Sequence, residues 1–240
     1  MPTVFLSAGH GGSDPGAVGY GMLEKNINLN IMLSCNEVLA RHGVTTVVSR
    51  TKDENDPVSQ EVKEANESGA LIAVSFHTNA GGGDGSETLY FTGSAEGKQL
   101  AELCEKHVKE LGQNSRGIKP RSDLWFVKAT NMPAVICECA FIDNDKDNDI
   151  IDTTEEQRKF GVAYAKAILE YLDIRYIEPN KEVETVSVVY NTINEVPEYA
   201  RPTIQKICDK GFLKGNEKGL GLSVDMTRIL VILDRTGVFG

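Results

Sequence analysis

The sequence opens with a short apolar run that ends at a histidine set among glycines. Residues 4–8 are apolar apart from one serine, and His10 follows them within a glycine-rich stretch, residues 9–12. An apolar run of this length predicts a β-strand that is buried on both faces. Ligands of open α/β sheets bind in the crevice at the carboxyl ends of the strands. We therefore expect an α/β sheet with His10 at its binding edge.

The same pattern returns twice further along the chain. Residues 71–76 lead into His77, and residues 134–137 lead into Glu138. Because the carboxyl ends of parallel strands meet at one edge of a sheet, we expect these side chains near His10. Two histidines, a carboxylate and an open position form a recurring catalytic zinc arrangement, in which a further carboxylate can serve as base. The pattern therefore predicts a catalytic metal site.

A fourth candidate, Glu24, begins the helix that is predicted over residues 24–41. Ile27, Ile31 and Val38 follow the spacing of one buried helix face, and Glu24 leans toward that face. A carboxylate there needs a partner, and a zinc ion would supply one. The alternative is an acidic residue that simply favours the positive N-terminus of the helix. Taken together with the first histidine, the metal-ligand interpretation is preferred.

Four groups of residues share their order and spacing with one known family. They are residues 9–17, residues 24–25, residues 75–80, and residues 133–138 with Phe141 and Asn144. Over roughly residues 1–173, the chain resembles the type-3 N-acetylmuramoyl-L-alanine amidases. The resemblance implies a twisted, mostly parallel sheet flanked by helices. It also implies cleavage of the amide that joins the muramic acid lactyl group to L-alanine in peptidoglycan.

The resemblance also assigns the residues of the site. It implies one Zn²⁺ per chain, held by His10, Glu24 and His77, with Glu138 as the catalytic carboxylate. The family usually has an arginine at the position of Glu61, and this departure would remove a structural or substrate contact while leaving the zinc ligands untouched.

Three further residues are predicted to contact substrate. Asn79 lies within one of the shared motifs, and Glu87 matches a recurrent acidic residue of the family. Trp125 is the only tryptophan of the chain, and it either packs on the sugar or peptide of the substrate or fills the core.

The charge of the chain argues against nucleic acid as a partner. The formal net charge is −10, and residues 1–180 carry all of it. Phosphate binding needs a basic face, which this distribution does not offer. No apolar run approaches the ~20 residues that span a bilayer, so membrane insertion is not expected. The N-terminus has no basic region followed by an apolar core, so we expect synthesis in the cytoplasm without a signal peptide and action at the cell wall after release.

The last quarter of the chain is predicted to form a separate domain. Residues 1–174 would be the catalytic domain, polar residues 175–184 a linker, and residues 185–240 a small, mainly helical domain. Residues 196–215, with a Thr-Arg pair at residues 227–228, resemble one S-layer-homology-type unit. That resemblance implies binding to a secondary cell-wall polymer, with a homodimer compensating for the single copy. The alternative is a small helical packing module.

We expect a peptidoglycan hydrolase of the phage or prophage endolysin kind. One alternative is a zinc endo- or carboxypeptidase that acts on cell-wall peptides, since the metal chemistry would be the same and only the bond cut would differ. Another is a non-catalytic cell-wall-binding protein, or a structural role dominated by residues 181–240. The presence of all four metal and base candidates argues against a decayed enzyme.

Overall fold

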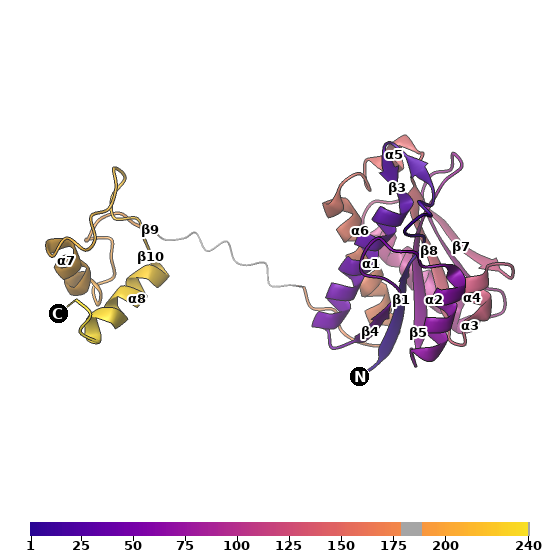
Figure 1. Cartoon of the computed structure of the whole chain (residues 1–240), viewed down its shortest axis with the longest axis horizontal. Helices are drawn as coiled ribbons and strands as arrows, with labels where there is room; N and C mark the ends of the chain where they lie inside the picture. The colour runs from indigo at the N-terminus through magenta and orange to yellow at the C-terminus, as the bar shows by residue number, and fades with distance from the viewer. Residues whose placement is uncertain (179–188, 240) are drawn as a thin grey trace. The chain divides into compact units, whose positions relative to one another are not determined.

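The computed structural model describes residues 1–178 and 189–239 of the chain, which fall into two compact units (Figure 1). The first unit spans Met1–Ile177 and the second spans Glu178–Gly240. Most of the predicted linker, residues 179–184, lies outside the described residues. Among the helices that are described, none has both the length and the apolarity needed to cross a membrane.

A six-stranded sheet forms the centre of the first unit. Its strand order is β4-β1-β5-β8-β6-β7, and every neighbouring pair is parallel except β6 and β8. The strands are β1 Thr3–Ala8, β4 Thr45–Val48, β5 Ile72–Asn79, β6 Ser86–Phe91, β7 Ser115–Arg121 and β8 Ala134–Phe141. The predicted α/β fold with a mostly parallel sheet is confirmed.

Helices cover both faces of this sheet, because alternate residues of each strand point to opposite faces. On one face α1 (Glu24–Arg41), α3 (Ala95–Lys109) and α6 (Thr154–Tyr171) enclose the larger apolar core. On the other face α2 (Val58–Glu67) and α4 (Trp125–Ala129) enclose a smaller one. Figure 1 shows α1 and α6 on one side of the sheet and α2 and α4 on the other.

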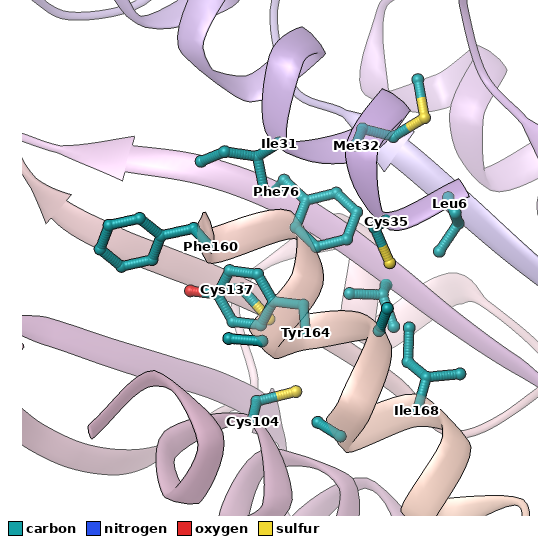
Figure 2. Close-up of a cluster of buried hydrophobic side chains, with 14 of the residues drawn as sticks. Leu6, Ile31, Met32, Cys35, Phe76, Cys104, Cys137, Phe160, Tyr164 and Ile168 are labelled. Carbon is teal, nitrogen blue, oxygen red and sulfur yellow. The ribbon is translucent and has the colours of Figure 1, made fainter. Parts of the chain in front are cut away.

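The larger core decides which strand residues are left for chemistry. In Figure 2, Phe76 of β5 and Cys137 of β8 lie in this core near Tyr164 of α6, and the rings of Phe76 and Tyr164 have centroids 5.3 Å apart. Burying a side chain of this size stabilises the fold by roughly 1.5–3 kcal/mol. Since Phe76 and Cys137 face this core, the next residues along their strands, His77 and Glu138, face the side covered by α2 and α4.

Two central strands are longer than their apolar runs predicted. β5 continues through His77 to Asn79, and β8 continues through Glu138 to Phe141. The extra residues remain in the sheet because their neighbours continue too: Glu138 is opposite His77 on one side and opposite Glu87 on the other. Glu138 therefore lies within a strand and not at its end.

The second unit is small and mainly helical. It contains α7 (Arg201–Asp209), α8 (Val224–Arg235), and a two-stranded sheet of β9 (Val189–Tyr190) and β10 (Leu222–Ser223). The buried residues of its apolar core cluster are Val196, Ala200, Ile204, Leu222 and Val231. Because so few residues form this core, it provides only a small hydrophobic stabilisation.

In this second unit the sequence also predicts a short strand over residues 186–190, a helix over residues 197–210 and Ser223 as a helix N-cap, and the structure confirms these in part. Ser223 caps α8, since its Oγ accepts a hydrogen bond from the Met226 N–H at 3.1 Å, as a predicted N-cap should. The helix predicted from Pro197 begins instead at Arg201, because residues 197–200 form a turn in which the Ala200 N–H donates to the Pro197 carbonyl. Residues 186–188 of a predicted strand lie outside the described residues.

Candidate active site

His10 lies on a tight turn directly after β1. Its backbone φ is +66°, a left-handed conformation that residues other than glycine adopt infrequently. The preceding residue, Gly9, donates its N–H to the Phe76 carbonyl of β5 at 3.0 Å. A Cβ at Gly9 would lie 2.1 Å from the His77 ring, so only glycine permits this approach. The predicted glycine break thus brings the two histidines together.

Glu24 is the first residue of α1, and its carboxylate is turned inward. The side chain is only about 5% exposed, and its Oε2 accepts a hydrogen bond from the Ala17 N–H at 2.8 Å. Its Oε1 accepts hydrogen bonds from the Thr78 N–H at 3.1 Å and from Asn28 Nδ2 at 3.2 Å. These three hydrogen bonds hold the carboxylate in one orientation, so Glu24 does more than favour the helix N-terminus.

The three predicted metal ligands converge on one point. Glu24 Oε1 lies 3.0 Å from His77 Nδ1 and 3.3 Å from His10 Nε2. One donor atom from each residue lies within 4.8 Å of the others. The imidazole rings meet edge to face, with centroids 5.1 Å apart and planes at 79°. Among the described residues this is the one cluster of such side chains with metal-binding spacing.

These residues fit a zinc ion. Two ligand atoms on a tetrahedral zinc lie roughly 3.4 Å apart, which is close to the two spacings measured from Glu24. Asp14 Oδ2 lies 2.8 Å from His10 Nδ1, the carboxylate–histidine contact that orients a metal-bound imidazole. The predicted cofactor is therefore compatible with the site.

The electrostatics of the cluster favour a positive charge between the ligands. The hydrogen bond with Glu24 raises the pKa of His10 to about 9. Burial alone would lower the pKa of His77, but its hydrogen bond with Glu24 raises it above the usual value. Burial would raise the pKa of Glu24, yet the two histidines hold it well below the usual value. The cluster thus retains protons that a divalent cation would displace on binding.

Glu138 lies beside the cluster without joining it. It is directly opposite His77 on the adjacent strand and shares its face of the sheet. Glu138 is partly exposed, and desolvation of its carboxyl raises the pKa to about 7. A carboxyl with this pKa can take up and release a proton near neutral pH, which is what a general base must do.

The predicted substrate residues lie in two places, with Trp125 apart from Asn79 and Glu87. Trp125 opens α4, is 53% exposed, and lines a pocket of about 460 Å³ with His10 and His77, so it does not fill the core. Glu87 is opposite Glu138 on β6 and accepts a hydrogen bond from Asn79 Nδ2 at 3.2 Å. The structure thus brings Asn79 and Glu87 together, and it places Trp125 in the pocket beside the histidines.

Some residues of the site had no clear signal in the sequence. Arg50 is buried and donates to the carbonyls of Ala8 at 2.9 Å and Lys25 at 2.7 Å. These partners are backbone carbonyls of residues that are distant from Arg50 in the sequence, so no pattern of side chains predicts the contacts. Glu61, noted only as a departure from the family, lines the same pocket, and burial raises its pKa to about 7.

The fold and the site together define an α/β protein with a candidate metal-dependent hydrolytic centre, built from the turn after β1, the start of α1, and the strands β5 and β8. The chain belongs to the N-acetylmuramoyl-L-alanine amidase family (Amidase_3), whose model matches residues 4–170. The predicted family is confirmed, and with it the class of activity, peptidoglycan hydrolysis.

Curated relatives and a solved structure agree with this assignment. The chain is 38% identical over 151 residues to the N-acetylmuramoyl-L-alanine amidase LytC of Bacillus subtilis (strain 168), a match that covers 60% of this chain and 30% of LytC. It is 33% identical over 181 residues to the endolysin of Bacillus phage SPP1, covering 72% of this chain and 66% of the endolysin. The catalytic domain of CwlV, an N-acetylmuramoyl-L-alanine amidase from Bacillus (Paenibacillus) polymyxa var. colistinus, matches with a TM-score of 0.68 and 31% identity, covering 73% of this chain and all of that domain.

Proposed function

We propose that this peptidoglycan hydrolase cleaves the amide between N-acetylmuramic acid and L-alanine, at a site that holds one Zn²⁺ per chain. His10 Nε2, Glu24 Oε1 and His77 Nδ1 would hold the ion. The observation that carries the proposal is the approach of Glu24 Oε1 to both histidines, at 3.3 and 3.0 Å, with Glu138 on the adjacent strand.

The residues of the chain divide the chemistry between them. When bound, a zinc ion polarises the scissile carbonyl and makes water a stronger nucleophile near neutral pH. Glu138 then accepts the proton of the attacking water and delivers it to the nitrogen of the leaving L-alanine. Asp14 keeps the His10 ring in the orientation that directs Nε2 toward the site.

Glu138→Gln tests this division of roles. The substitution keeps the shape of the side chain and removes its basicity, so turnover should fall by about 10²- to 10⁴-fold. Elemental analysis should find unchanged zinc, and Glu102→Gln on the exposed side of α3 should behave like the wild type. Loss of zinc from Glu138→Gln would make Glu138 a ligand, and wild-type turnover would mean that the base is another residue.

The bond that is cut can be identified by mass spectrometry of digested peptidoglycan. We expect new free amino termini on L-alanine and no new reducing sugar ends. New amino groups on a diamino acid or on D-alanine would instead assign the chain to the cell-wall peptidases.

For residues 185–240, which lie in the second unit, we propose attachment to the cell wall through a secondary wall polymer, with self-association of two chains strengthening the attachment. The resemblance to an S-layer-homology-type unit supports this role. The cell wall, where the substrate lies, is then the place of action after release, in the manner of an endolysin.

A further inference from the structure

The pocket beside the candidate metal site has an apolar wall and an acidic wall. It reaches from the two histidines onto the sheet face that α2 and α4 cover, and it holds about 460 Å³. Trp125 and Ile136 form part of the apolar wall. Asp56, just before α2, and Glu61, in the first turn of α2, form the acidic wall. None of these four residues has a part in the hydrolytic chemistry described above.

Glu61 is a deeply buried acid without a cationic partner. The residue is only 3% exposed, and no lysine, arginine or histidine among the described residues lies within 4.0 Å of its carboxylate. The buried guanidinium of Arg50 directs its hydrogen bonds to backbone carbonyls, including those of Ala8 and Lys25. A buried carboxylate is costly unless a charge or a hydrogen-bond donor meets it. Beside Glu61 the described part of the fold supplies the Ser7 hydroxyl but no cation.

Two polar atoms beside Glu61 are also left without partners. Asp56 is 8% exposed, and its Oδ2 has no hydrogen bond within the described part of the chain. Ser75, on β5 two residues before His77, is fully buried, and its Oγ is likewise unpartnered there. Both residues line the pocket. Buried polar groups in native proteins are nearly always satisfied, so unsatisfied acceptors that line one pocket indicate a ligand with N–H groups.

We propose that this wall is a subsite for a primary ammonium group on an aliphatic chain. An ammonium has three donors and no acceptor, which matches two carboxylates and a hydroxyl. Its methylene stem would pack along Trp125 and Ile136. The identity of the ligand rests on the proposed function: it is the side chain of a diamino acid in the stem peptide, with its side-chain amine free.

This assignment makes a distinction between substrates. In cross-linked peptidoglycan the side-chain amine is acylated, which removes its charge and two of its donors. Glu61 and Asp56 would then face a neutral amide, and the buried carboxylates would stay uncompensated. The enzyme should therefore prefer stems that are not cross-linked at this amine.

The test compares two soluble substrates. They are N-acetylmuramoyl-L-alanyl-γ-D-glutamyl-L-lysine and the same compound acetylated on the lysine side chain. We expect the wild type to favour the free amine by about tenfold or more in kcat/KM, the scale of a charge-assisted hydrogen bond. Glu61→Gln and Asp56→Asn should reduce this ratio toward one. Glu61→Arg should bring it below one, because a guanidinium repels the ammonium.

The matched control is Glu67→Gln, an exposed acid at the end of α2, which should keep the wild-type ratio. Equal rates on both substrates for the wild type would overturn the subsite while leaving the proposed function intact. An unchanged ratio in the Asp56 and Glu61 variants would also overturn it, and Asp56→Asn decides if the Glu61 variants do not fold. A second zinc per chain that Glu61→Gln abolishes would make the wall a metal site. Failure of the wild type to cleave either compound would contradict the amidase function itself.

Discussion

Arg50 shows how one side chain can set the geometry of residues that it does not touch. Its guanidinium donates to the Ala8 carbonyl before the His10 turn and to the Lys25 carbonyl after Glu24. The two segments are thereby held together at the point where each delivers a ligand. Arg50 is thus a positioning residue for the metal site.

We predict that Arg50→Lys weakens zinc binding by about 10- to 100-fold, the usual effect of losing support behind metal ligands. Lysine keeps the charge, but its three donors all sit on one nitrogen, so it cannot span the separated carbonyls that Arg50 reaches from different nitrogens of its guanidinium. Competition with a chromophoric chelator measures the affinity, and exposed Arg41→Lys is the control. Unchanged zinc affinity in Arg50→Lys would show that the two segments hold themselves in place.

At the scale of elements, α6 contributes a large buried ring with an unmet polar atom. Tyr164 is fully buried against Phe76, and its hydroxyl has no hydrogen-bond partner within the described residues. We predict that Tyr164→Phe leaves the free energy of unfolding unchanged or raises it by about 1 kcal/mol, since an unsatisfied group is removed. Tyr164→Ala should lower it by about 3–5 kcal/mol, because a cavity replaces the ring.

Chemical denaturation of the two Tyr164 variants measures both effects. Strong destabilisation by Tyr164→Phe would mean that the hydroxyl has a partner in solution, such as a buried water.

The elements also show what the sequence could predict and where it stopped. The apolar runs before His10 and His77 predicted both strands and the edge at which the histidines meet, because burial of both strand faces leaves a strong pattern. The position of Glu138 inside β8 was not predicted, since continued pairing depends on the backbone of neighbouring strands. The contacts of Arg50 and the pocket wall of Glu61 arise from tertiary packing, which has no local pattern.

At the scale of the whole molecule, the boundary between the two units suggests a truncation after residue 177. The Ile177 N–H donates to His42 Nε2 at 2.9 Å, and the Tyr176 ring stacks on His42 with centroids 5.2 Å apart. A cut at this point preserves both contacts. We predict that residues 1–177 fold alone and cleave soluble substrate at the rate of the full chain, because the described site residues all lie within this unit.

The same truncation should lose binding to intact walls, measured by co-sedimentation with purified wall fragments. Full binding by residues 1–177 would remove the proposed role of the second unit. An insoluble product would show that the first unit depends on the second.

The pairing of β1 with β5 has a consequence for kinetics. His10 and His77 are separated by more than sixty residues, and they meet only when the Gly9 N–H reaches the Phe76 carbonyl. Zinc should therefore find its full set of ligands only after the transition state for folding has been crossed. In stopped-flow experiments, zinc should lower the logarithm of the unfolding rate constant in proportion to the stabilisation that zinc binding provides. The refolding rate should stay nearly unchanged. Faster refolding with zinc would mean that the metal gathers these distant segments early, and the ion would then act as a nucleus for the sheet.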